Sequence, residues 1–333
     1  MNENNNKRKP FLGKNGGKLE GLNANFKKRT IILHPTVLVL ATYVMLLFSK
    51  IIDITLVNRE NEYFSVVILQ MMIFILPGAL WCMFSGEKYM STLRLKAFKP
   101  RHLVLIVSAT VIMAMGGLLI SLLIGGLENL SNNFSLYDTF VSKDKGTVPS
   151  RIYLVMAYAV LPAIGEEFIY RGILCSEYEK GGVTRAVVFS SLFFALLHFN
   201  LRNLPVYIFS GIILALTLYA TKSLFGAILT HFLYNIFGIF GQSYMSNLYR
   251  ITSSPKLFVI LAVLLFLVAA IIFCAEAARL YKNYLYKAPP AEYRQPIIKN
   301  PAIKRKSYID VIKAPSAIAC FAIYILALVI SFI

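Results

Sequence analysis

Long apolar runs follow one another along most of this 333-residue chain. A helix needs about 20 mostly apolar residues to cross the ~30 Å hydrocarbon core of a bilayer. The runs near that length lie at about residues 34–52, 64–85, 103–127, 151–176, 184–202, 205–221, 223–243, 257–278 and 315–333. Composition agrees, because 57% of the residues are hydrophobic and only 15% are charged, against about 25% charged in a soluble domain. We therefore predict an all-α, polytopic membrane protein with about nine transmembrane helices.

The net charge of +18 is concentrated in the N-terminal tail and in loops between the apolar runs. Residues 1–30 form a basic tail, which we expect to be disordered, and residues 86–102 and 279–314 form basic loops. The loops at 53–63 and 128–150 are acidic or near neutral. This alternation follows the positive-inside rule and predicts a multi-pass protein of the cell membrane with a cytoplasmic N-terminus. It indicates contact with the lipid bilayer and not with nucleic acid.

Three ionisable residues stand together inside the fourth apolar run, in the segment Gly165–Gly172. Each costs roughly 2.5–3.5 kcal/mol at membrane depth, so such residues pair, contact water or perform chemistry. Glu167 and Arg171 are four residues apart, on one helix face and in the favourable order for an ion pair. Glu166 points about 100° away and is left free on a neighbouring face. The plain structural alternative is a buried salt bridge with a second carboxylate that faces a water pocket.

Two later runs carry further polar side chains, namely His198, and His231 with Asn235 four residues on, which share a helix face. Taken singly, such a histidine is usually a packing residue, and a His–Asn pair can bridge two helices by hydrogen bonds. Tyr170, on the face of Glu166, is also expected to pack. Together, however, an acid, two imidazoles and an amide are the groups that activate water and stabilise an oxyanion. We interpret the set as a catalytic site.

These residues form three motifs in chain order, which read EExxxR at 166–171, FxxxH at 194–198 and HxxxN at 231–235. With all three motifs, the chain resembles the CPBP family, also called the Abi family, which includes the type II CAAX prenyl endopeptidases. The resemblance covers about residues 150–240 and implies an intramembrane glutamic protease fold.

The resemblance also implies a role for each motif residue. Glu166 is the general base that activates water, and His198 assists it. His231 and Asn235 stabilise the oxyanion. Glu167 and Arg171 form the supporting pair.

The chemistry implied in this way uses no cofactor and no metal. The family has also been described as metallopeptidases, which offers zinc as the less favoured alternative, bound by Glu166, His198 and His231. Against zinc, the HExxH signature, which places two ligands and a base on one helix, is absent from the sequence. The four cysteines are scattered without a CxxC, and we interpret them as small hydrophobic residues: Cys82, Cys175, Cys274 and Cys320.

The domain organisation follows from these motifs. We expect a basic tail at 1–30, transmembrane helices at 31–149, a protease core at 150–243, and further transmembrane helices at 244–333. For Glu166 and His198 to meet, the fourth helix must continue towards Glu179 and the fifth towards Arg202, and we expect that they do.

The predicted function is that of an intramembrane endopeptidase, which cleaves a membrane-associated peptide or a membrane protein near the membrane surface. The alternative is a non-catalytic membrane protein that keeps the fold and serves bacteriocin immunity, or that scaffolds a partner through the basic loop. A transporter is less favoured, because no inverted repeat or matched pair of broken helices is evident. No sequence feature specifies an oligomeric state.

Overall fold

The computed structural model describes residues 34–55, 68–86, 89–126, 151–286 and 301–332. Every regular element within these ranges is a helix. Six helices are long and apolar enough to cross a membrane, at Ile68–Ser85, Pro100–Gly125, Arg151–Gly181, Leu204–Thr221, Leu224–Gly241 and Pro255–Lys282. The predicted all-α, polytopic membrane class is therefore confirmed.

The principal helices succeed one another with short connections. They are α2 (Pro35–Thr55), α4 (Leu76–Ser85), α5 (Leu103–Gly125), α8 (Arg151–Val155), α9 (Leu161–Glu167), α10 (Cys175–Tyr178), α11 (Val183–Leu196), α12 (Leu204–Thr221), α13 (Leu224–Ile236), α14 (Gln242–Thr252), α15 (Pro255–Tyr286), α16 (Pro301–Ile312) and α17 (Pro315–Phe332). Wider π-helical turns lie at Met71–Ile75, Met156–Val160, Phe168–Leu174 and Phe237–Gly241, and tighter turns at Tyr89–Leu93, Pro100–His102 and Glu179–Gly181. Because α8, α9 and α10 are joined through such turns, residues Arg151–Gly181 form one long helix.

All nine predicted runs contain helix, but they do not all have the length of a span. Helix α11 has 14 residues, which reach about 21 Å at 1.5 Å per residue and fall short of the bilayer core. Helices α16 and α17 are bent by 52° and count as a seventh span only when taken together. The number nine therefore stays a prediction.

One expectation about helix ends is right and one is wrong. The long helix does continue beyond Arg171, as far as Gly181. Helix α11 does not continue towards Arg202 but ends at Leu196. A turn follows it, in which Phe199 adopts a positive φ of 45° and the Asn203 amide donates to the Asn200 side chain at 3.0 Å.

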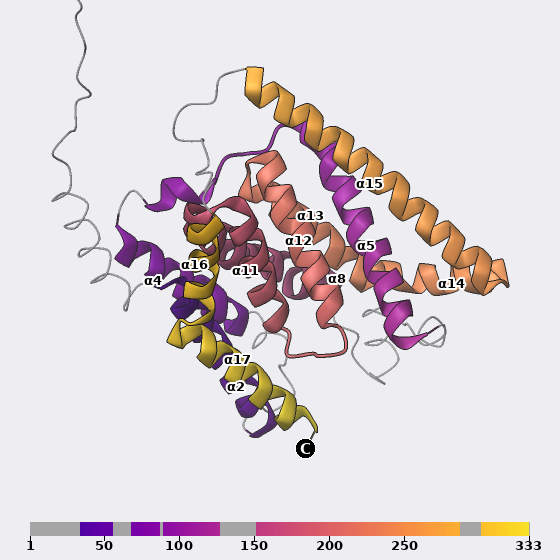
Figure 1. The fold of residues 1–333 in the computed structure, drawn as a ribbon. Coiled ribbons are helices and arrows are strands. Elements are labelled where there is room, and N and C mark those ends of the chain that lie inside the picture. The colour runs from indigo at the N-terminus through magenta and orange to yellow at the C-terminus, as the bar shows by residue number, and fades with distance from the viewer. Residues whose placement is uncertain (1–33, 56–67, 87–88, 127–150, 287–300, 333) are drawn as a thin grey trace, which may run out of the picture.

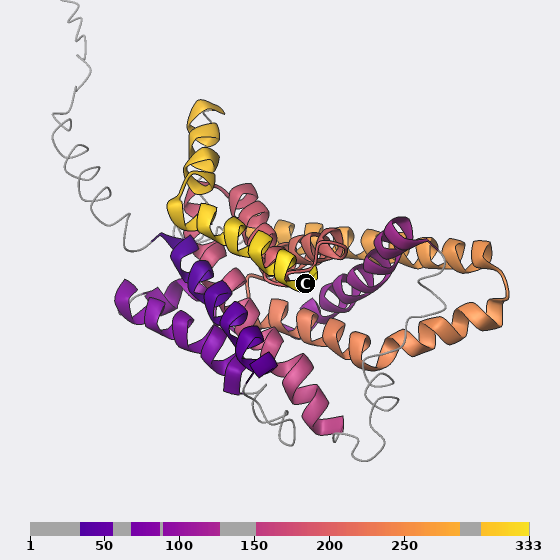
Figure 2. The ribbon, with the colours of Figure 1, turned by 90° about the horizontal axis from the view of Figure 1, so that it is seen from below.

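The helices enclose a central group formed by α11, α12 and α13 (Figure 1). Helices α5 and α15 pack together along one side of it, and α2 and α17 pack together on the other (Figures 1 and 2). Helices α11 and α12 lie close together at Gly211, where a Cβ atom would lie 2.9 Å from the Cα atom of Ser191. Only glycine fits there, and its carbonyl oxygen is left within reach of the site described below.

Several predicted segments lie outside the described residues. They are the tail at 1–30, the loop at 128–150, and residues 56–63 and 287–300 of two further loops.

Candidate active site

The carboxylate motif lies where a regular helical turn gives way to a π-helical turn at Phe168. Such turns are rare and occur often at functional sites. Arg171 donates from Nη1 to Glu167 Oε1 at 2.8 Å, and neither side chain has exposed surface. The ion pair expected from the four-residue spacing is therefore present.

A second set of contacts fixes the guanidinium of Arg171. Its Nη2 donates to the carbonyl oxygen of Gly211 on α12 at 3.0 Å. Its central carbon lies 4.3 Å from the centre of the Phe194 ring, which belongs to α11. The buried guanidinium thus connects the long helix to two neighbouring helices. Its ion pair also fixes the position of the Glu167 carboxylate.

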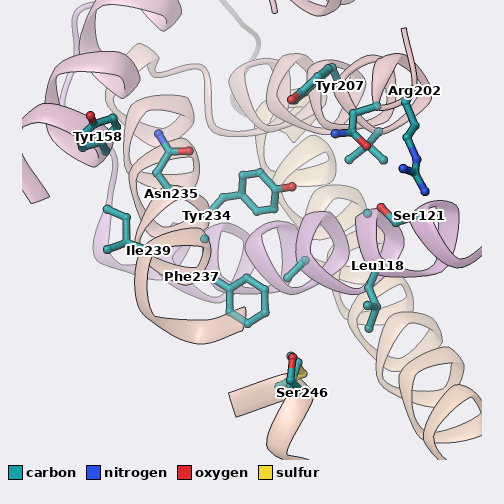
Figure 3. Close-up of a pocket in the computed structure, with 16 residues that line it drawn as sticks. Leu118, Ser121, Tyr158, Arg202, Tyr207, Tyr234, Asn235, Phe237, Ile239 and Ser246 are labelled. Carbon is teal, nitrogen blue, oxygen red and sulfur yellow. The ribbon is translucent and has the colours of Figure 1, made fainter. Parts of the chain in front are cut away.

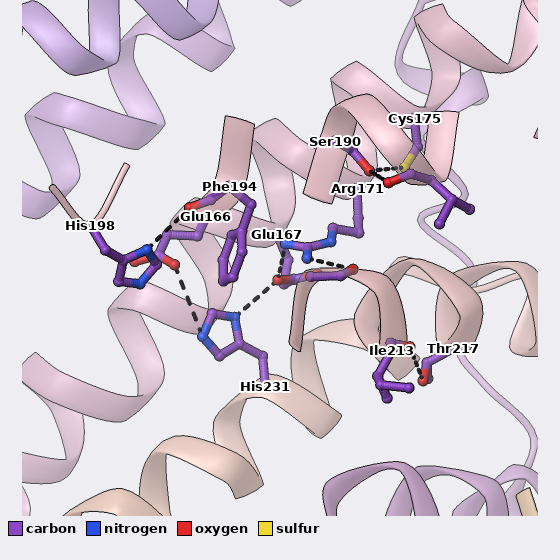
Figure 4. Close-up of polar contacts among 12 residues, drawn as sticks. Glu166, Glu167, Arg171, Cys175, Ser190, Phe194, His198, Ile213, Thr217 and His231 are labelled. Atoms are coloured by element: carbon purple, nitrogen blue, oxygen red, sulfur yellow. Dashed lines mark hydrogen bonds and ion pairs between the residues drawn. The ribbon is translucent and has the colours of Figure 1, made fainter. Parts of the chain in front are cut away.

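His231 on α13 lies between the two carboxylates (Figure 4). Its Nδ1 hydrogen is donated to Glu167 Oε1 at 2.9 Å. Its Nε2 lies 4.0 Å from Glu166 Oε2, a buried oxygen that has no hydrogen-bond partner among the described residues. Glu167 therefore sets the orientation of the imidazole, and Nε2 is the nitrogen turned towards Glu166.

His198 lies in the turn that follows α11. Its Nδ1 hydrogen is donated to the carbonyl oxygen of Phe194 at 3.1 Å (Figure 4), so Nε2 of a neutral ring can accept a proton. The imidazole stacks on Tyr207 of α12, with ring centres 3.8 Å apart and planes 15° apart. The residue after it, Phe199, has the positive φ noted above, a strained conformation of the kind that gathers at active sites.

The ring of Phe194 contacts three of the predicted site residues. His198 and His231 meet its ring edge to face, with centres 5.2 and 5.8 Å away, and Arg171 lies over its face. The sequence singled out this residue only as the first letter of FxxxH. The sequence did not indicate Tyr207 or the carbonyl of Gly211, because their contacts with His198 and Arg171 depend on how α12 packs against the other helices.

Asn235 stands apart from this cluster. It lies one helical turn after His231 and lines a cavity of about 510 Å³ (Figure 3). Tyr207 lines the same cavity. The structure therefore brings five of the six predicted site residues together, through Phe194 and the ion pairs of His231 and Arg171, and places the sixth in the adjacent cavity wall.

The zinc alternative can be compared with these contacts. Both histidines donate Nδ1–H to an oxygen, to Glu167 from His231 and to the Phe194 carbonyl from His198, an arrangement that metal ligands also show. Nevertheless, the described part of the chain contains no group of three or more His, Cys, Asp or Glu side chains that could hold a metal ion. Metal-free chemistry and zinc chemistry both stay predictions.

Fold and site together define a polytopic helical membrane protein with a buried carboxylate–histidine centre. Residues 148–237 match the family model described as type II CAAX prenyl endopeptidase Rce1-like. This part of the chain is therefore related to the CPBP family, as the three motifs predicted, and the relation supports a protease that acts in the membrane. No curated protein and no solved structure matches the chain.

Proposed function

We propose that the protein is an intramembrane endopeptidase that hydrolyses a peptide bond of a membrane-associated peptide or protein. The observation that carries the proposal is the pairing of Glu166 with His231. A carboxylate oxygen without a hydrogen-bond partner lies 4.0 Å from Nε2 of an imidazole whose other nitrogen is held by Glu167. A carboxylate that accepts a proton and an imidazole held in one orientation can, at this separation, act on the same substrate group.

In the proposed reaction, Glu166 takes a proton from a water molecule, assisted by Nε2 of His198. The water oxygen attacks the carbonyl carbon of the substrate and forms a tetrahedral oxyanion. The proton held by Glu166 then passes to the leaving nitrogen as the C–N bond breaks. The products are a carboxylic acid and an amine, so the atoms of one water molecule are accounted for.

The oxyanion needs donors, and we assign this role to His231 and Asn235. An imidazole with hydrogen on both nitrogens donates from Nδ1 to Glu167 and keeps Nε2–H for the oxyanion. Loss of one such donor typically costs about 2.7–4 kcal/mol of transition-state stabilisation. Arg171 contributes indirectly, because it holds the carboxylate that orients His231.

The test compares wild-type and Glu166→Gln cells by quantitative mass spectrometry of membrane-associated peptides. We expect products that appear only with the wild-type protein, because glutamine cannot accept the proton. Glu177→Gln is the matched control, since this carboxylate of the same long helix pairs with Lys180 at 2.6 Å and lies outside the site. Equal product levels in wild type and Glu166→Gln would contradict the proposal.

The same variants separate the enzyme from its alternative. A non-catalytic immunity or scaffolding protein would keep its cellular phenotype in both Glu166→Gln and His231→Ala, provided that the variants fold. Elemental analysis of the purified wild-type protein decides between metal-free and zinc chemistry, since a zinc enzyme would carry about one ion per chain.

A further inference from the structure

The cavity beside the catalytic cluster is lined by residues of α5, the long helix, α12, α13 and α14, and by the turns that precede α12 and follow α13 (Figure 3). Tyr207 and Asn235 come from α12 and α13, within the residues that match the family model. Ser121 of α5 and Met245 and Ser246 of α14 come from outside those residues. Half of the lining residues therefore lie outside the matched part of the chain, and this part of the wall can select what enters.

Two side chains connect the cavity to the catalytic centre. Tyr207 lines the cavity and stacks on His198 at 3.8 Å. Asn235 lines it one turn after His231, on the same helix face. A substrate segment held in the cavity therefore lies against the groups that would act on the neighbouring peptide bond.

The charge on the cavity lining is positive. Among the sixteen described residues that line the cavity, Arg202 is the single charged one, and none is acidic. The rest include the hydroxyls of Tyr158, Tyr207 and Tyr234 and the amides of Asn203 and Asn235. A guanidinium among neutral polar groups is complementary in charge and shape to a carboxylate, which it can bind through two parallel hydrogen bonds.

We propose that this cavity binds a carboxylate-bearing segment of the substrate and that Arg202 is the residue that binds the carboxylate. The hydroxyls and amides around it hydrogen-bond the peptide backbone of that segment. The inference rests on the proposed function. The carboxylate comes either from the C-terminus of the substrate or from an Asp or Glu side chain next to the cleaved bond, and the experiment distinguishes these sources.

The first measurement needs no cleavage. Ser121→Cys, which places a thiol in the cavity wall beside Arg202 (Figure 3), is made in a Cys274→Ser background, because the other three native cysteines are buried. The thiol is modified with an anionic reagent, 2-sulfonatoethyl methanethiosulfonate, and with its cationic trimethylammonioethyl counterpart. Arg202→Gln should lower the ratio of the anionic to the cationic rate by about tenfold, since a charged cavity raises the local concentration of opposite charge.

Two control variants accompany this measurement. Arg202→Lys keeps the charge and should keep most of the rate ratio. Arg250→Gln removes an exposed cation of α14 that does not line the cavity, and it should leave the ratio unchanged. A ratio that Arg202→Gln does not change would overturn the proposal, whatever the protein cleaves.

The second measurement uses a peptide recovered from the comparison of wild-type and Glu166→Gln cells. It is synthesised with a free C-terminus, with a C-terminal amide, and with Asp and Glu near the cleaved bond replaced by Asn and Gln. Removal of the recognised carboxylate should raise KM about tenfold with little change in kcat, and Arg202→Gln should abolish the difference. Equal KM values for all three forms overturn the inference. Identical peptides in wild-type and Glu166→Gln cells overturn the proposed function instead, and the thiol measurement still decides the charge of the cavity.

Discussion

Arg171 is the residue on which the arrangement of the buried centre depends. It has no exposed surface, and it contacts the Glu167 carboxylate, the Gly211 carbonyl and the Phe194 ring at once. Removal of one partner of a buried ion pair leaves an uncompensated charge, which is far more costly than the pair itself is stabilising.

We therefore expect Arg171→Met, which keeps an unbranched side chain but removes the guanidinium, to lower the free energy of unfolding by about 3–5 kcal/mol. Arg171→Lys keeps the charge but cannot reach both Glu167 and Gly211, so its loss should be smaller. Thermal unfolding of purified protein in detergent measures both. Arg279→Met is the control, because this half-exposed arginine pairs with Glu276 at 2.5 Å and should change stability by less than about 1 kcal/mol. An Arg171→Met variant as stable as wild type would contradict this view of the centre.

The sequence predicts contacts within one helix better than contacts between helices. The Glu167–Arg171 pair followed from helical spacing alone, since a separation of four residues fixes the distance. The bond from His231 to Glu167 did not, because 64 residues separate the partners and their meeting depends on how α13 packs. The motifs predicted which side chains gather, and the packing determined that His231 faces both carboxylates.

At the scale of elements, α11 ends early and depends on helices outside the matched core. Tyr43 of α2 donates to the carbonyl oxygen of Phe193 at 2.5 Å, in the last turn of α11. Phe199, just after His198, packs against the rings of Tyr43 and Tyr324, at 5.6 and 6.2 Å between centres. Hydropathy extended α11 to Arg202 because the residues after His198 include Phe and Leu. A helical period does not reveal a turn that is held by neighbouring helices.

Tyr43 and Tyr324 form a matched pair that tests this support. Both are buried and both pack on Phe199. Only Tyr43 has a hydrogen bond for its hydroxyl, whereas that of Tyr324 has no partner among the described residues. Tyr43→Phe should lower the free energy of unfolding by about 0.6–1.7 kcal/mol, the range for hydrogen bonds within membranes.

Tyr324→Phe should leave stability unchanged or raise it slightly, because it removes an unsatisfied buried hydroxyl. Both variants are compared by thermal unfolding and by cleavage of the recovered peptide. A Tyr43→Phe variant as stable as wild type would show that ring packing, which both substitutions keep, and not the bond to Phe193, holds the end of α11.

At the scale of the whole molecule, the basic loop at 86–102, which the charge pattern assigns to the cytoplasm, meets two other connections at one end. The Leu224 amide donates to the Arg94 carbonyl at 3.0 Å, and Ser223 Oγ donates to the Lys96 carbonyl. Arg94 pairs with Glu179, near the end of the long helix, at 2.6 Å. Loop charge assigned the loop at 86–102 to one side of the membrane, but it did not predict which connections contact one another. Their mutual contacts depend on the packing of three helices.

The predicted orientation can be tested with single cysteines at the two ends of the bundle, in a Cys274→Ser background. Lys180→Cys lies at the end where the basic connections meet, and its native side chain is 65% exposed. Asn247→Cys lies on an exposed position of α14, at the far ends of α13 and α15. If the N-terminus is cytoplasmic, a membrane-impermeant maleimide should label Asn247→Cys in intact cells and Lys180→Cys only after permeabilisation. The opposite pattern would place the basic end outside and would contradict the predicted orientation.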